Sequence, residues 1–279
     1  MRNLFKLNLG VKSIKMVKFS SILNGVVSVC AAILLISCLV SAAPSGASTT
    51  FIQTGSAPND SAMSLPAVAG NVTEVNLYGY STTRSWQGFY GNVSGTIQLA
   101  DAGDNVFYNW SDVSPKGQVY ISTNNSIQWA YTECFNYTAT GTYASDVGQA
   151  GSTSLYGTNL TQLETQYGIS VDDVDGVNET FNLYGGGTHN SFFVGNLQFD
   201  NGECRSTRIF SSAGVGEDNK FEEVLLYEPQ SASVIFSTLL NSDVLGFDGR
   251  SHDFESIVLE NGHGTDTSST TYYFYLELQ

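Results

Sequence analysis

Basic residues are scarce in this sequence. The 279 residues include 11 lysines and arginines against 26 acidic residues, and five of the 11 lie within the first 18 positions. The rest of the chain therefore carries six positive and 26 negative side chains, a formal net charge of −20. Nucleic acids and anionic membrane surfaces are bound by clustered lysine and arginine. We therefore expect neither as a partner, and the charge itself favours solubility.

Cysteine is also rare, with four residues in the chain. Cys30 and Cys38 fall in an apolar N-terminal region, which leaves Cys134 and Cys204 elsewhere. Two cysteines in an exported protein most simply form one disulfide, which here closes a loop of about 70 residues and contributes about 3–4 kcal/mol. The alternatives are two free thiols or a metal site, but neither cysteine has C-x-x-C spacing or a nearby histidine.

Recognisable catalytic motifs are missing. His189, His252 and His263 lie in separate segments and form no zinc-binding pair. His252 precedes Asp253, which could orient its imidazole, but no serine in a nucleophile-elbow setting accompanies them. The glycine-rich turn Gly185–His189 lacks the lysine and the strand-to-helix context of a phosphate-binding loop. We therefore predict no enzyme, no nucleotide and no organic cofactor, and we expect each histidine in a turn or on the surface.

The acidic run Asp172–Glu179 has the best pattern for a metal. Asp172, Asp173 and Asp175 precede Gly176, and oxygen ligands at alternate positions before a glycine suit calcium. The run lacks the full spacing and the final glutamate of an EF-hand, so a solvated acidic turn is the alternative. An extracellular hydrolase assisted by calcium is one functional hypothesis, although no pair of carboxylates stands out among the 26 acids.

The first 42 residues have the pattern of a secretory signal peptide. Basic residues precede an apolar run, and small residues follow, with an acceptable cleavage site after Ala42. Two alternatives remain open: the apolar run approaches the length of a retained membrane anchor, and Leu35–Cys38 looks like a lipobox in which Cys38 is lipidated. Each version exports the rest of the chain, so we expect a secreted, extracellular protein at the cell surface.

Eight N-x-[ST] sequons mark asparagines that can carry a sugar in an exported protein. None of the seven asparagines after Asn178 belongs to a sequon. We therefore expect glycans on the part of the chain up to Asn178. After it, we expect a surface that is free of glycans or in contact with a partner. The predicted acceptors are Asn59, Asn71, Asn92, Asn109, Asn124, Asn136, Asn159 and Asn178.

Residues 71–279 alternate between apolar and polar side chains, which is typical of half-buried β-strands. Val106–Trp110, Ile127–Tyr131 and Tyr272–Leu278 are examples. The pattern predicts an all-β fold, an antiparallel β-sandwich, with a sub-boundary near 170–180 if it consists of two lobes.

Two segments depart from the alternation. Residues 43–70 are small, polar and aperiodic, which predicts a flexible leader or linker. One short helix is predicted near 159–168, where an apolar stripe lies between Asn159 as N-cap and a terminating Gly168.

The stretch Trp86–Thr96 combines aromatic residues, glycines and a sequon, but it contains no acid, histidine or cysteine. It can therefore perform no acid–base or nucleophilic chemistry. Trp86, Phe89 and Tyr90 are candidates for a platform on which a sugar ligand stacks. Trp110 and Trp129 lie on the apolar faces of predicted strands, so we expect both in the core.

Several segments resemble a group of exported archaeal surface proteins. They are TTRSWQGFYGNVSGTIQLAD, NETFNLY with THNSFFVGN, VIFSTLLNSDVLGFDGRSHDFESIVLENG and the terminal TTYYFYLEL. The resemblance covers nearly all of residues 71–279. It implies a β-rich ectodomain and supplies no catalytic residues.

Export, clustered sequons and the missing catalytic set predict a glycosylated structural protein of the cell surface, such as a subunit of a filament or an envelope layer. Such a subunit would associate with itself or with other surface proteins. Its C-terminal strand would complete its own sheet or pair with a neighbour through Tyr272, Phe274, Leu276 and Leu278. The alternative is a carbohydrate-binding module or adhesin that recognises glycans.

Overall fold

The computed structural model describes residues 43–58, 61–111, 114–135, 137, 159–170, 172–263 and 268–279. The predicted signal peptide, with Cys38, lies outside these ranges. Strands dominate the described part of the chain, so the predicted all-β, antiparallel class is confirmed. The strands are β1 (Ser45–Gly46), β2 (Trp86–Gly91), β3 (Thr96–Ala100), β4 (Val106–Ser111), β5 (Gly117–Ser122), β6 (Glu133–Cys134), β7 (Phe192–Val194), β8 (Leu197–Phe199), β9 (Ser206–Arg208), β10 (Glu222–Glu228), β11 (Ser233–Leu239), β12 (Val244–Leu245), β13 (Ser251–His252), β14 (Phe254–Leu259) and β15 (Tyr273–Leu278).

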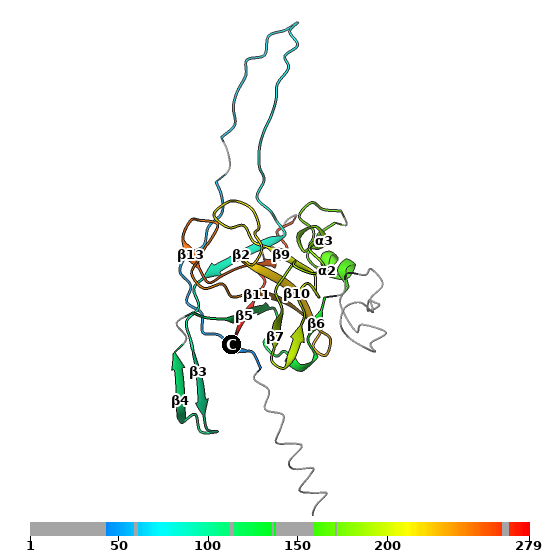
Figure 1. Ribbon diagram of the computed structural model, residues 1–279. Coiled ribbons are helices and arrows are strands. Elements are labelled where there is room, and N and C mark those ends of the chain that lie inside the picture. Colours follow the sequence, from blue (N-terminus) through cyan, green and yellow to red (C-terminus); the bar gives the residue numbers. More distant parts are fainter. Residues whose placement is uncertain are drawn as a thin grey trace, which may run out of the picture. The chain divides into compact units, whose positions relative to one another are not determined.

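A seven-stranded antiparallel sheet forms the centre, in the order β1-β15-β5-β11-β10-β6, with β9 also paired to β10 (Figure 1). The long strands β10 and β11 are neighbours in sequence and pair from Glu223 opposite Thr238 to Glu228 opposite Ser233. β5 and β15 extend the sheet beyond β11. Segments more than 150 residues apart in sequence therefore lie side by side, because strand pairing joins the C-terminus to the middle of the chain.

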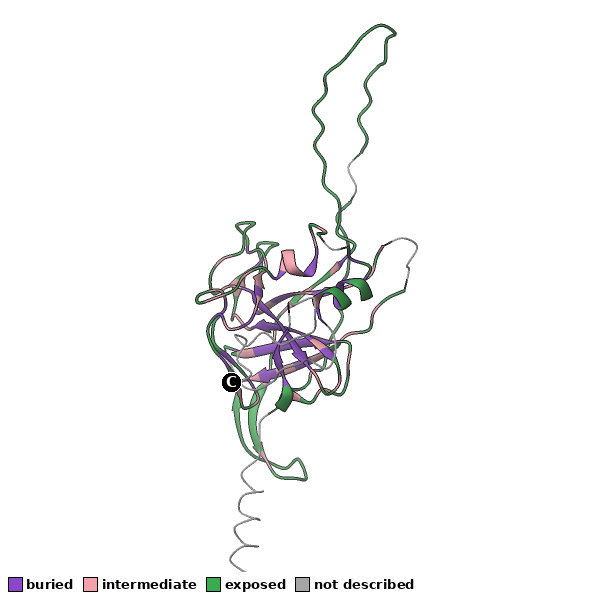
Figure 2. Ribbon diagram, turned by 90° about the vertical axis from the view of Figure 1, so that its right-hand side faces the viewer, coloured by how far each residue is buried: buried purple, intermediate pink, exposed green. Residues whose placement is uncertain are grey.

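Both faces of this sheet are buried, as the purple colour of its strands shows (Figure 2). Alternate residues serve the two faces, so on β5 Ile121 contributes to one core and Tyr120 to the other. The first core lies under the antiparallel β14–β2 ribbon and the helices. The second lies under the β7–β8 hairpin and is joined by both cysteines. A sheet covered on both sides explains why the residues of β10 and β11 are buried almost without interruption rather than at alternate positions.

The helix predicted near 159–168 is confirmed as α2 (Leu160–Gln166). Asn159 accepts the amide hydrogen of Gln162 through its side chain, and the Gln162 side chain returns to the Asn159 amide, which is a capping box. Gly168, with φ of +68°, follows the helix end. A second helix, α3 (Val177–Thr180), and a 3₁₀ turn, η1 (Trp129–Tyr131), were not predicted.

Three sequence expectations are corrected. Ile127–Tyr131 forms no strand, because Trp129 begins η1 and packs beside Tyr120 and Tyr275. The leader 43–70 contains β1, which pairs with β15 through backbone bonds that need no side-chain pattern. Among the described residues no division near 170–180 appears, since Ala43–Gln279 forms one compact unit in which residues of α2 and α3 join the first core.

Candidate functional site

The β3–β4 hairpin is exposed along nearly its whole length. Its turn is built by Asp101, whose Oδ1 accepts the amide hydrogens of Gly103 and Asn105, each at 2.9 Å. The Asn105 side chain also donates to Asp101, and these hydrogen bonds lower the pKa of that carboxyl. The sequence Asp-Ala-Gly-Asp-Asn thus sets the turn locally, as expected of turn-forming residues.

The two faces of the hairpin differ in character. Ile97 lies opposite Trp110 and Leu99 opposite Tyr108, so these four large side chains share one face. The rings of Tyr108 and Trp110 lie 4.7 Å apart. Gln98 and Asn109 form the pair between them and share the other face.

The apolar face is open to solvent. The exposed fractions are 40% for Ile97, 52% for Leu99, 56% for Tyr108 and 50% for Trp110. Val106–Ser111 is confirmed as a strand, but the expected core position of Trp110 is wrong, since the whole of β4 is exposed. Figure 2 shows this ribbon in green against the purple central sheet. Isolated two-stranded hairpins are marginally stable, and large exposed apolar patches usually mark interaction sites.

The segment from residue 47 to residue 83 is a second exposed region. Apart from residues 59–60, which are not described, it has no strand or helix of its own. Phe51, Ile52, Leu77 and Tyr78 are among its strongly exposed apolar side chains. Long connections without secondary structure are usually linkers or functional loops. The predicted leader therefore extends about a dozen residues further than its composition indicated.

The predicted sugar platform is not assembled. Trp86 lies half-buried, with its indole N–H donating to the carbonyl of Asp175 at 2.7 Å. Phe89 packs edge-on against Phe274, with ring centroids 5.2 Å apart. Both rings join the first core, so only Tyr90 of the three is exposed. Alternation along β2 could not reveal this, because the rings that contact Trp86 and Phe89 are Phe181 and Phe274, which are distant in the sequence.

Tyr90 belongs instead to a cluster that sequence reasoning missed. Its ring lies 5.0 Å from that of Phe247 and 4.8 Å from that of His252. Asp248 accepts from Arg250 at 2.6 Å and contacts His252 Nε2 at 2.9 Å. Burial alone would raise the pKa of Asp248, but the hydrogen bonds from Arg250 and His252 outweigh it and lower that pKa to about 2. No local signal links β2 to this loop, which follows 160 residues later.

The histidines are placed differently from expectation. His252 is buried and contacts Asp248 rather than Asp253, whose carboxylate accepts the amide hydrogens of Val93 and Asp243. His189 is fully buried, and that burial lowers its pKa. His189 and His263 both lie in bends, as expected of turn residues, but only His263 is partly exposed.

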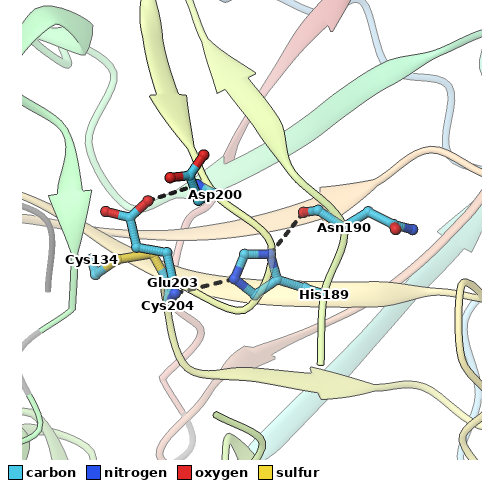
Figure 3. Close-up of a disulfide and its surroundings, with 6 residues drawn as sticks. All are labelled: Cys134, His189, Asn190, Asp200, Glu203 and Cys204. Atoms are coloured by element: carbon cyan, nitrogen blue, oxygen red, sulfur yellow. Dashed lines mark hydrogen bonds between the residues drawn. A yellow bond between two sulfur atoms is a disulfide. The ribbon is translucent and has the colours of Figure 1, made fainter. Parts of the chain in front are cut away.

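The predicted disulfide joins Cys134 to Cys204, with Cα atoms 5.3 Å apart. His189 lies beside it (Figure 3). Nδ1 of His189 contacts the carbonyl of Asn190 at 2.8 Å, and Nε2 accepts the amide hydrogen of Cys204 at 3.1 Å. The carbonyl bond requires hydrogen on Nδ1, so the ring is neutral and fixes the backbone next to the disulfide. Both ring nitrogens are engaged by backbone groups, so the arrangement is structural.

The residues considered as calcium ligands lie in and around a turn. Asp173 Oδ2 accepts the amide hydrogen of Ser170 at 3.2 Å, and the carboxylate of Asp175 accepts the hydroxyl of Thr83. Asp172 is exposed at a left-handed φ of +75°. Gly176 then caps α3. Within the described ranges, no group of three or more metal-ligating side chains comes together.

The C-terminal strand completes its own sheet. β15 pairs with β5 over its whole length and with β1 at its other edge. Tyr272, Phe274 and Leu276 pack against the first core, as the alternation indicated. The opposite face is also covered, because Tyr275 and Glu277 are buried. In the described chain β15 is therefore not a free strand that could pair with a neighbouring copy. Leu278, the last residue of the strand, is half-buried beside Gly95.

The predicted glycan acceptors differ in accessibility. Asn71, Asn92 and Asn109 are exposed, Asn124 and Asn178 are half-buried, Asn159 is buried as the helix cap, and Asn59 and Asn136 lie outside the described residues. Exposed acceptors in β4 and after β2 can carry a sugar without displacing protein.

Buried carboxylates are a further feature without a sequence signal. Glu223 is fully buried, and burial raises its pKa to about 8. Burial, and then the charge of Glu228, raises the pKa of Glu133 to about 7. A substrate could not reach the carboxylates of β6 and β10, because Glu133, Glu222, Glu223 and Glu228 are all nearly inaccessible. The acids therefore form part of the interior and do not line a catalytic cleft.

The cavity found in the described residues is too small to indicate a ligand. One hollow of about 40 Å³ lies beside Tyr167, Phe236 and Tyr272, which is far below the size of a typical small-molecule site. None of the helices in the described ranges has the length and apolar character of a membrane span. No protein-family model, curated protein or solved structure matches the chain.

Proposed function

We propose that this chain is an exported structural protein of the cell surface whose copies associate through the apolar face of the β3–β4 hairpin. The single observation behind this proposal is the exposed set of Ile97, Leu99, Tyr108 and Trp110 on one face of a two-stranded ribbon. Residues of this size normally lie in a core. A partner that covers them would supply the missing second layer of a small sandwich.

Charge favours a second copy as that partner. The chain beyond residue 42 carries six basic and 26 acidic side chains, so two copies repel one another over most of their surface. β3 and β4 contain no charged residue. The hairpin acids Asp101 and Asp104 lie in the turn, away from the apolar pairs. The uncharged face is therefore the surface on which copies can approach at the lowest electrostatic cost.

The area predicts a weak individual contact. If each of the four side chains offers about 200 Å² when fully exposed, roughly 400 Å² of each hairpin is open. Two hairpins packed face to face would bury about 800 Å² through these side chains, below the ~1,200 Å² typical of stable complexes. Symmetric pairing of one patch with itself is the commonest form of self-association. High local concentration at a cell surface then compensates for a weak single contact.

The test is the association state of the purified full-length mature protein, measured by sedimentation equilibrium over a wide concentration range. Tyr108→Glu places a charge on the apolar face and should reduce the association constant at least tenfold. Gln98→Glu, on the opposite face of the hairpin, adds the same charge and should associate like wild type. Circular dichroism confirms that both variants remain folded. Monomeric wild type at all concentrations, or equal association of both variants, would refute the proposal.

Electron microscopy of native protein taken from cells addresses the assembly itself. A regular filament or lattice that is lost in Tyr108→Glu is the expected result. Discrete single particles in wild type would contradict a structural role.

A further inference from the structure

The proposed hairpin contact leaves several exposed aromatic side chains uncovered, and two of them lie close to a sequon. Phe107 is 83% exposed and belongs to β4, and Tyr90 is 37% exposed on β2. Both stand two positions before the asparagine of a sequon, Asn109 and Asn92 respectively. We infer that N-linked sugars on Asn92 and Asn109 fold back over Tyr90 and Phe107 and cover them. In this arrangement the chain's own glycans cover the exposed parts of the two aromatic rings.

The spacing along the chain keeps each ring near its acceptor asparagine. Residues two apart in an extended strand point to the same face and lie about 7 Å apart. Phe107 and Asn109 are separated by Tyr108, which points to the apolar face with Leu99. Asn109 shares its face with Gln98, and Phe107 is the extra residue of a β-bulge, because Leu99 pairs with Tyr108 and Ala100 with Val106. A glycan on Asn109 leaves the apolar face free for a second copy.

The backbone around Asn92 is held in place. The amide of Asp253 donates to the carbonyl of Gly91 at 2.9 Å, and the carboxylate of Asp253 accepts the amide hydrogen of Val93 at 2.8 Å. Asn92 itself is exposed between these two anchors. Asn92 directly follows β2, so its side chain starts two residues from Tyr90, whose ring also contacts Phe247 and His252.

The chemistry suits a sugar better than another protein group. One face of a pyranose ring presents C–H bonds, which make dispersion contacts with an aromatic face, while its hydroxyls stay in water. A flexible sugar tethered two residues away has a high effective concentration at the ring. The other six sequons have Ala, Ser, Cys or Gly at the equivalent position, so they lack this partner.

The experiment uses full-length protein expressed in a host that attaches N-linked sugars, with occupancy measured by mass spectrometry. Ser111→Ala removes the Asn109 sequon but keeps the asparagine. Hydrogen exchange of amides in Thr96–Ser111 should become about threefold to tenfold faster in this variant, as expected for loss of one aromatic contact. In the Phe107→Ser background, removing the same sugar should change exchange by less than twofold.

The contact between Tyr90 and the sugar on Asn92 is tested by thermal melting. Ser94→Ala, which removes the Asn92 sequon, is compared in the wild-type and Tyr90→Thr backgrounds. The melting temperature should fall in the first background and stay constant in the second. Thr73→Ala is the matched control, because it removes the exposed Asn71 sequon, which has Ala69 at the aromatic position. Its loss should leave hydrogen exchange and melting unchanged.

Two results would overturn the inference: unmodified Asn92 and Asn109 in the mass spectrum, or sugar effects that persist after Phe107→Ser and Tyr90→Thr. The inference shares with the proposed function only the export of the chain. Self-association is measured separately with Tyr108→Glu, so either proposal can fail while the other holds.

Discussion

Replacing Glu223 with glutamine tests how this acidic protein tolerates a buried carboxyl. Glu223 lies on β10 and accepts hydrogen bonds from the hydroxyl of Ser256 at 2.6 Å and the amide of Ile257 at 2.9 Å, both on β14. It therefore links the central sheet to the β14–β2 ribbon. Burial favours the neutral carboxyl and raises its pKa from 4.5 to about 8, because the two hydrogen bonds offset only part of the desolvation.

The direction of the pH effect follows from this pKa. The folded protein holds the Glu223 proton up to about pH 8, whereas the unfolded chain releases it near pH 4.5, so folding takes up a proton between these values. Stability from this group is complete below pH 4.5 and is lost as the pH rises towards 8. The loss amounts to about 4 kcal/mol over that window. This is a large part of the roughly 5–15 kcal/mol that stabilises a typical domain.

Glutamine has nearly the same shape, can keep both hydrogen bonds and does not titrate. Urea unfolding of wild type and Glu223→Gln should therefore give similar free energies at pH 5, with the variant about 4 kcal/mol more stable than wild type at pH 8. In melting temperature the gap at pH 8 should be about 10 °C for a chain of this size. Burial raises the pKa of Glu133, Glu164 and Glu255 too, so the variant keeps a weaker dependence of the same sign.

The control is Glu74→Gln, which removes one carboxyl from the exposed segment and leaves the core unchanged. It should follow the wild-type profile. Parallel profiles for wild type and Glu223→Gln, offset by a constant, would show that Glu223 does not take up a proton on folding, and the reasoning would fail.

Two further predictions concern local structure. Exchanging Cys134 and Cys204 together for serine should lower the unfolding free energy by about 4 kcal/mol, because the disulfide closes a loop of 70 residues; an unchanged urea midpoint would contradict this. Asn159→Ala should cost about 1 kcal/mol through loss of the capping box. Thr161→Ala removes the same sequon but keeps the cap, so an equal loss in that variant would assign the effect to a sugar instead.

Features governed by local chemistry could be predicted. α2 begins at Asn159 and is followed by Gly168 because capping and left-handed φ depend on the residues at those positions. The Asp101 turn and the strands around it follow from turn formers between alternating residues. The pairing of Cys134 with Cys204 followed from counting, since no other cysteine lies beyond the N-terminal region.

The candidate surfaces were predicted less well, because exposure depends on what covers a strand. Trp110 and Trp86 both occur in aromatic strands, yet the first is exposed and the second lies against the first core. The alternating pattern identifies two faces but does not say whether either has a partner. The surroundings of Tyr90 could not be predicted either, because its neighbours Phe247 and Arg250 come from a loop that is distant from β2 in the sequence.

By itself, the sequence determined the charge imbalance, the sequon positions, the cysteine pair, the capped helix and the antiparallel class, since each depends on composition or on neighbouring residues. Only the tertiary structure decided which carboxyls are buried, such as Glu223, and which apolar face stays open, as on the β3–β4 hairpin. Burial is a property of elements brought together across long sequence distances, and those pairings arise from the packing of the whole chain.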